Sequence, residues 1–228
     1  MFSKFMSAWR SKALLSQALE RTEKMLNSVA KSHRLVIGCL AKGSKCDVDI
    51  YARDRYINHM SREVRRLVAE HLVINPKRDT VAALVLLNVD IDIERCGDFT
   101  KNILELAEHY DRPFAESMGY EVLSEIEALV SADFDLTHKA FVDSDNEAAA
   151  QVLENHRIVS TKSDGLIEKL FYSEEKLDPR DAIFCTLLSR YLKRINAHLM
   201  NVASTVINPF DWVSYQYDGD PADAEELD

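Results

Sequence analysis

Three carboxylates recur at steps of four residues in one stretch of the chain: Asp90, Glu94 and Asp98. If this stretch is helical, their side chains lie along one side of it, because residues four apart are neighbours on a helix. Such a row repels itself by roughly a few tenths of a kcal/mol for each pair, so it requires cations nearby. Arg95 and Lys101 are close in the sequence. A bound metal ion is the alternative, since hard and borderline cations accept carboxylate oxygens, although the same spacing is common on solvated helices.

The carboxylates belong to a segment with a continuous apolar seam over 82–107, where apolar or small residues alternate at steps of four and three. This pattern is typical of a helix that packs against other helices. The same spacing, interrupted at Gly43, Pro76 and Pro113, predicts six long helices. His33 lies in the apolar stripe of the first, which indicates a core histidine rather than a metal ligand. The predicted helices cover about 15–42, 47–74, 79–110, 118–144, 145–172 and 177–208.

The composition favours a helical protein that does not bind nucleic acid. The chain has 228 residues, of which 46% are hydrophobic, enough for a full core. It contains six glycines and five prolines, too few for a turn-rich sheet protein. The net charge of −10 argues against a nucleic-acid binder, which needs a basic surface to neutralise phosphates. No apolar run approaches the roughly 20 residues of a membrane span, so we expect at most peripheral membrane contact.

The cysteines Cys39, Cys46, Cys96 and Cys185 are scattered along the chain and form no CxxC pair. This distribution predicts reduced thiols rather than a disulfide framework or a zinc site. We therefore expect a cytoplasmic protein.

The two ends of the chain differ in charge. Residues 1–13 carry basic residues and no acid, with aromatic residues at helical spacing. This lead-in lacks the unbroken apolar core of a secretory signal. It is interpreted as packing on the body or on a second subunit, while a membrane-surface segment and an organelle transit peptide stay open. Residues 208–228 form a tail with seven acidic residues and no basic one.

The sequence repeats itself at a distance of 99 residues. This shift places Arg95 on Arg194 and Asn102 on Asn201, and it aligns the apolar seams of the third and sixth predicted helices. The chain therefore consists of two units of three helices each. Because short loops make neighbouring helices antiparallel, we expect an all-α protein with two tandem antiparallel three-helix bundles. The first bundle is expected over 14–112 and the second over 113–207.

The repeated motif resembles the signature of the PhoU family. The sequence D-I-E-R-C-G-D over 92–98, followed by N-I at 102–103, looks like the family's D-L-E-R-I-G-D with a downstream N-I. The segment 190–202 looks like a second copy, and the similarity extends from about residue 14 to 206. The resemblance implies a cytoplasmic, non-enzymatic regulator of inorganic phosphate uptake. It also implies contact with a phosphate transporter or a sensor histidine kinase, and we expect a homodimer.

The resemblance further implies a metal site. Some members of the family bind iron, zinc or similar ions through E/D-x-x-x-D pairs on the second and third helices of each bundle. Carried over to this chain, the ligands of a divalent or ferric ion (iron, zinc, nickel or magnesium) would be Asp54, Asn58, Glu94 and Asp98. Asn58 stands where the family often has Asp, and an amide ligates without charge, which lowers the expected affinity.

The second bundle departs from this ligand pattern. Lys193 stands where a Glu is expected, and Ala197 where an Asp is expected. A lysine ammonium is unfavourable beside a divalent cation. Arg190, Arg194 and His198 add positive charge nearby. We expect any metal to be confined to the first bundle and the second to contact an acidic partner, with simple drift after loss of a dispensable site as the alternative.

Other classes of protein lack their motifs here. A ferritin-like di-iron enzyme would need two E-x-x-H motifs, and the nearest approach is Asp135 with His138, which occurs once. A hydrolase would need a nucleophile beside a base, or a glycine-rich phosphate loop, for which G-S-K at 43–45 is too short. A metal-free helical scaffold with no phosphate role stays open.

Overall fold

A computed structural model describes residues 13–43, 47–75, 77, 79–110, 112–174, 176–208, 210 and 213–214. Within these residues the chain forms six α-helices, one short 3-10 helix η1 (Phe114–Glu116) and no strand. The predicted all-α fold is therefore confirmed. The predicted lead-in up to residue 12 and most of the acidic tail lie outside the described residues. The helices are α2 (Ala13–Lys42), α3 (Ile50–Ile74), α4 (Thr80–His109), α5 (Tyr120–Asp143), α6 (Asn146–Phe171) and α7 (Pro179–Ile207).

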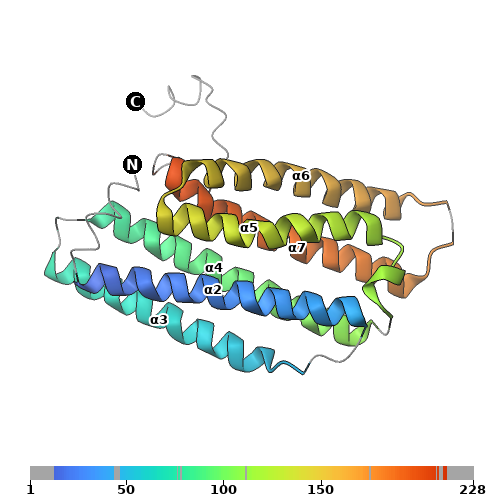
Figure 1. Cartoon of the computed structure of the whole chain (residues 1–228), viewed down its shortest axis with the longest axis horizontal. Helices are drawn as coiled ribbons and strands as arrows, with labels where there is room; N and C mark the ends of the chain where they lie inside the picture. Colours follow the sequence, from blue (N-terminus) through green and yellow to red (C-terminus); the bar gives the residue numbers. More distant parts are fainter. Residues whose placement is uncertain are drawn as a thin grey trace, which may run out of the picture.

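The helices form two groups of three that lie side by side (Figure 1). One group contains α2, α3 and α4, and the other contains α5, α6 and α7. The groups meet mainly through α4 and α7, which run in opposite directions, and to a lesser extent through α2 and α5. This is the expected pair of three-helix bundles. None of the described helices is long and apolar enough to cross a membrane.

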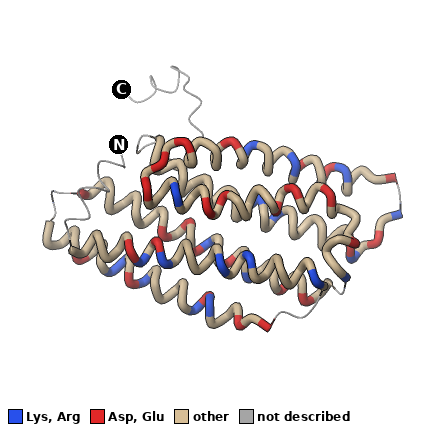
Figure 2. Tube along the Cα trace, in the orientation of Figure 1, with Lys and Arg blue, Asp and Glu red and all other residues tan. Residues whose placement is uncertain are grey.

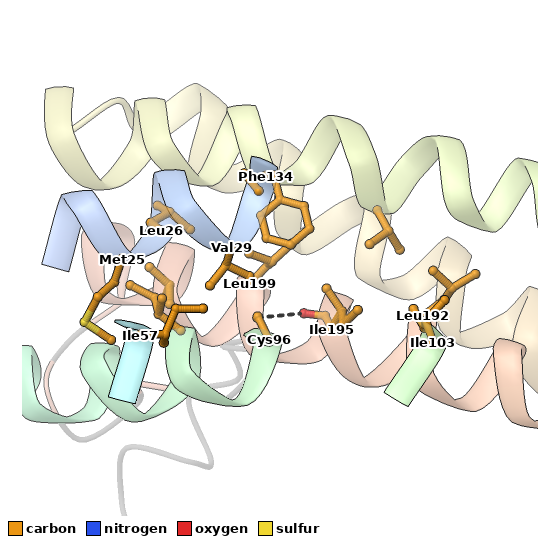
Figure 3. Packing of buried hydrophobic residues seen from close by; sticks show 14 of the residues in the cluster. Met25, Leu26, Val29, Ile57, Cys96, Ile103, Phe134, Leu192, Ile195 and Leu199 are labelled. Atoms are coloured by element: carbon orange, nitrogen blue, oxygen red, sulfur yellow. Dashed lines mark hydrogen bonds between the residues drawn. The ribbon is translucent and has the colours of Figure 1, made fainter. Parts of the chain in front are cut away.

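One large apolar core extends through both bundles and the space between α4 and α7, and a smaller separate cluster lies among α5, α6 and α7. Two apolar seams meet at the crossing of these helices, where the Cys96 thiol donates to the carbonyl oxygen of Ile195 at 3.6 Å (Figure 3). Cys96 and Ile195 are equivalent positions of the 99-residue repeat. The contact therefore lies at the centre of an approximate two-fold relation between the bundles. The α4 seam buries Ala82, Leu86, Val89, Ile93, Cys96 and Ile103, and the α7 seam buries Cys185, Leu188, Leu192, Ile195, Leu199 and Val202.

Aspartates cap the starts of three helices. The carboxylates of Asp49, Asp145 and Asp178 accept hydrogen bonds from backbone N–H groups in the first turns of α3, α6 and α7. Asp79 stands at the corresponding position before α4 but does not cap it with its side chain. Asp79 has a left-handed backbone (φ 61°) and makes no side-chain cap bond. Its carboxylate lies 3.2 Å from Nε2 of His71 instead.

Buried cysteines and a buried histidine are held in the core. Cys96 and Cys185 are free thiols, and burial raises the pKa of both, for Cys185 to about 11. Cys39 is disulfide-bonded, so the prediction of reduced thiols is wrong at this position. His33 is fully buried against Phe134, with ring centroids 5.1 Å apart, as expected for a core histidine. Among the described residues neither of its ring nitrogens has a hydrogen-bond partner, although Nε2 lies 4.0 Å from Oε1 of Glu127. Burial lowers the pKa of His33 to about 4.

Candidate functional site

The four predicted metal ligands lie on two adjacent helices. Asp54 and Asn58 are one turn apart on α3, Glu94 and Asp98 are one turn apart on α4, and all four are partly exposed. The structure brings three of them together. Nδ2 of Asn58 donates to Oδ2 of Asp54 at 3.1 Å. Nζ of Lys101 bridges the helices, 3.2 Å from Oδ1 of Asp54 and 3.5 Å from Oδ1 of Asp98.

Gly97 allows α3 and α4 to approach closely beside this group. A Cβ atom at Gly97 would lie 3.2 Å from Cδ1 of Ile57 on α3, which is tighter than an ordinary contact. The glycine of the motif therefore has a packing role. It keeps the backbones close enough for short side chains on one helix to reach the other.

Glu94 belongs to a separate ion-paired group with Arg65 of α3. Nη2 of Arg65 donates to Oε2 of Glu94 at 2.8 Å, and its Nε donates to Oδ2 of Asp90 at 3.1 Å. Ser61 also donates to Oδ2 of Asp90, at 2.8 Å. Burial raises the pKa of Asp90, and the bonds from Ser61 and Arg65 oppose this shift. The motif contains no signal for these pairings, because Arg65 and Ser61 come from another helix.

Protein cations already neutralise the predicted ligands. Lys101 bridges Asp54 and Asp98, where a shared metal ion would have to lie, and Arg65 holds Glu94. Asn58 directs its amide N–H toward Asp54 rather than its oxygen. Among the residues that the structure describes, no group of three or more His, Cys, Asp or Glu side chains is placed to hold a metal ion. As placed, the four residues do not fit a metal, and metal binding by them stays a prediction.

The second bundle has an ion pair at the equivalent place, with the charges exchanged. Nζ of Lys193 lies 2.7 Å from Oδ1 of Asp164. The 99-residue shift places Arg65 on Asp164 and Glu94 on Lys193. Both bundles therefore join their second and third helices with an ion pair at the same positions. Figure 2 shows basic and acidic residues interspersed along these helices.

A polar and aromatic cluster joins α4 to α7 beside their crossing. Nδ1 of His198 lies 2.8 Å from Oδ1 of Asp92, and Asn201 donates to the same oxygen at 2.9 Å. Phe99 stacks on the ring of His198, with centroids 5.8 Å apart, and also lies near Tyr191, at 6.1 Å. The carboxylate of Asp92 is therefore used to hold the two bundles together.

The outer side of α7 keeps two positive charges. Arg190 and Arg194 are exposed and lie one turn apart. The neighbouring basic side chains are engaged, Lys193 by Asp164 and His198 by Asp92. Among the described residues, no ion pair or hydrogen bond is made by either arginine side chain. This face is therefore able to bind an anion or an acidic protein surface.

The second bundle also contains a buried polar network that the sequence motifs do not reveal. Asp133 is fully buried, and its two carboxylate oxygens accept hydrogen bonds from the side-chain amides of Asn155 and Asn196, both at 2.6 Å. Nδ1 of His156 lies 2.8 Å from Oδ1 of Asn196. Burial without a cation raises the pKa of Asp133 to about 7. The only signal in the sequence is that Asn196 replaces the motif glycine, Gly97, in the second repeat.

Comparisons with known proteins agree with this architecture. The PhoU domain model matches residues 22–107 and 123–206, one match in each bundle. The phosphate transport system regulatory protein PhoU from Streptococcus pneumoniae has a similar crystal structure, with a TM-score of 0.75 and 13% identity over 91% of this chain and 95% of that one. PhoU from Pseudomonas aeruginosa gives a TM-score of 0.72 and 23% identity over 86% and 96%. A comparison with curated protein sequences gave no match.

At these identities the two crystal structures support the fold, while the two domain matches establish the family. The chain belongs to the PhoU family of regulatory, non-enzymatic proteins and contains two PhoU domains.

Proposed function

We propose that this chain regulates inorganic phosphate uptake in the cytoplasm by binding a phosphate transporter or a sensor histidine kinase. The observation that carries the proposal is the match of a PhoU domain in each bundle, at 22–107 and 123–206. The similar protein from Streptococcus pneumoniae is described as a phosphate transport system regulatory protein. In this proposal the chain acts through protein contact with the transporter or the kinase.

The α7 face with Arg190 and Arg194 supports contact with an acidic partner. The chain as a whole has a net charge of −10, and this pair, like Arg62 and Arg66 on α3, adds exposed positive charge. Guanidinium groups bind carboxylates through two parallel hydrogen bonds, which gives geometric specificity as well as attraction. Exposed charges also steer association, and this effect weakens as the salt concentration rises. We expect the second bundle to provide this contact.

Exposed apolar residues at the ends of two helices support self-association as a homodimer. Val73 and Ile74 close α3 with exposed fractions of 81% and 68%, and Phe171 and Tyr172 close α6 with 80% and 73%. Val73 and Tyr172 are equivalent in the repeat. Apolar groups exposed together often mark an interaction site. Light scattering coupled to gel filtration tests the proposal, and a mass of one chain at all concentrations would contradict it.

Affinity capture from solubilised native membranes, followed by mass spectrometry, tests the regulatory role. The wild-type chain is expected to recover subunits of a phosphate transporter or a sensor histidine kinase. The double variant Arg190→Glu/Arg194→Glu is expected to lose them. Arg62→Glu/Arg66→Glu is the matched control, because it changes the charge equally on exposed arginines one turn apart on α3.

Recovery of neither protein class by the wild-type chain would contradict the regulatory role and favour the metal-free scaffold. If both double variants lose the partner equally, the proposal that the α7 face binds the partner is wrong. The proposed role in phosphate regulation is not contradicted by this result.

A further inference from the structure

We propose that the Lys101 ammonium occupies the place of a metal ion in the acidic site on α3 and α4. The native chain therefore excludes divalent metal ions from this site, and replacement of Lys101 by a neutral residue creates a metal site. The inference concerns the residues predicted as metal ligands. It does not depend on regulation of phosphate uptake, because its test requires no transporter or kinase.

The position of the Lys101 ammonium is the first observation. Nζ contacts carboxylates from two helices, Asp54 of α3 at 3.2 Å and Asp98 of α4 at 3.5 Å. The side chains of Lys101 and Asp54 are only 22% and 19% exposed, so solvent screens the contact incompletely. Lys101 therefore places its side-chain cation between the two acids.

The surrounding groups are arranged for a lysine rather than for a metal ion. A metal ion would need oxygen ligands directed at one point, with no cation between them. Here Asn58 turns its N–H toward Asp54, which is a hydrogen bond within the protein and not a ligand geometry. Glu94 is drawn away to Arg65 at 2.8 Å. A divalent ion would have to displace the ammonium, break the Arg65 pair and rotate the Asn58 amide.

The second bundle lacks the predicted ligand set but also joins its second and third helices through a lysine–aspartate pair. The four ligand positions of the first bundle correspond to Leu153, Arg157, Lys193 and Ala197, which contain no carboxylate. Lys193 is nevertheless neutralised, by Asp164 at 2.7 Å. In each bundle a lysine on the third helix thus forms an ion pair with an aspartate on the second helix. The two lysine–aspartate pairs are not at equivalent positions of the repeat, so each bundle forms its own ion pair between its second and third helices.

Metal titration of a Lys101 variant tests the inference. Lys101→Met removes the ammonium and keeps an unbranched chain, which leaves Asp54 and Asp98 without their shared cation. Calorimetric titration with Mn²⁺, Zn²⁺ and Ni²⁺ chlorides is expected to show binding of about one equivalent to this variant. Its affinity should exceed that of the wild type by roughly a hundredfold or more, because a like charge within a few ångström of the site has been removed.

Three further variants make the test specific. Lys101→Arg keeps a cation and is expected to bind as weakly as the wild type. Lys101→Met/Asp54→Asn/Asp98→Asn is expected to lose the gained site. Lys24→Met is the matched control, because Lys24 pairs with Glu20 on an exposed surface of α2 and its loss should create no metal site.

Thermal unfolding with and without metal provides a second readout. A metal that binds only the folded chain raises its melting temperature. The rise should appear in Lys101→Met and not in the wild type, even if the variant is less stable at the start. The inference would be overturned if the wild type bound metal as tightly as Lys101→Met. It would also be overturned if folded Lys101→Met, or the more polar variant Lys101→Gln, bound no metal.

Discussion

Replacement of Asp133 by asparagine is expected to change how stability depends on pH. Asp133 is fully buried between Asn155 and Asn196, and none of the described cations pairs with it. Burial raises its pKa from 3.8 to about 7. In this interval the folded chain holds a proton that the unfolded chain has released. Stability due to this group is therefore complete below pH 4 and is lost as the pH rises to 7.

The loss of folding stability due to Asp133 can be calculated from its pKa in the folded and unfolded chains. A difference of roughly 3 units corresponds to about 4 kcal/mol, at about 1.4 kcal/mol for each unit. The amide introduced by Asp133→Asn does not titrate, but its NH2 group cannot accept the hydrogen bond that Asn155 or Asn196 donates to a carboxyl oxygen, so near pH 4 the variant should be less stable than the wild type by roughly 1–3 kcal/mol. Between pH 4 and 7 the wild type should lose up to about 4 kcal/mol of stability relative to Asp133→Asn.

The contribution of His33 to folding stability changes with pH in the opposite direction to that of Asp133. Burial lowers its pKa from 6.5 to about 4, so the unfolded chain binds the extra proton between these values. Stability due to His33 is therefore gained as the pH rises from 4 to 6.5, by about 3 kcal/mol in total. In the wild type, Asp133 and His33 nearly cancel in this range. Relative to the wild type, the stability of the Asp133→Asn variant should rise with pH over this range, because the opposing contribution of Asp133 is removed.

Urea unfolding of both proteins at intervals from pH 4 to 8 measures these slopes. Asp143→Asn is the control, since Asp143 lies nearer the surface at the end of the same helix, α5. Parallel pH profiles for the wild type and Asp133→Asn would refute the reasoning. They would mean that the buried carboxyl is already ionised in the fold, with Asn155 and Asn196 stabilising the charge as well as water does.

Two further sets of variants test an ion pair and the turn after α2, again by urea unfolding. Arg65→Ala is expected to cost roughly 2–3 kcal/mol, because it leaves the buried Asp90 without its cation, while Arg66→Ala on the exposed side of α3 should cost less than about 0.5 kcal/mol. Equal costs would mean that Arg65 contributes nothing through Asp90. Gly43→Ala is expected to cost more than about 1 kcal/mol, because Gly43 has φ +59° and a Cβ atom there would lie 2.8 Å from a backbone nitrogen. Gly38→Ala, with nothing within 4 Å of the new Cβ and a helical backbone, should stabilise by up to about 1 kcal/mol.

The helices were predictable because their signals are local. Apolar spacing specifies the buried side of each helix, and Gly43 and Pro113 lie in the breaks between helices. The cap at Asp79 shows the limit of this reasoning. An aspartate before a helix usually caps it, but here a neighbouring helix offers His71 as a partner for the carboxylate. A contact between helices thus overrides a local preference.

The candidate site was less predictable, because its chemistry depends on which helix covers each carboxylate. Asp90, Glu94 and Asp98 share one spacing in the sequence, but Asp90 is fully buried and the other two side chains are about one-third exposed. The motif specifies where these residues stand along α4. It contains no information that Arg65 reaches two of them from α3 or that Lys101 turns toward Asp54.

The two bundles have kept the same packing and changed their polar groups, and the geometry of the crossing explains why. The seams of α4 and α7 pack on each other at Cys96 and Ile195, so a change of size on one side must be accommodated by the other. Polar positions away from the crossing carry no such constraint. The pair Arg65–Glu94 and its reversed equivalent Asp164–Lys193 show that pairing has been retained while the sign of each charge has not. A repeat protein of this kind therefore holds one fold in both halves and is free to present a different surface from each.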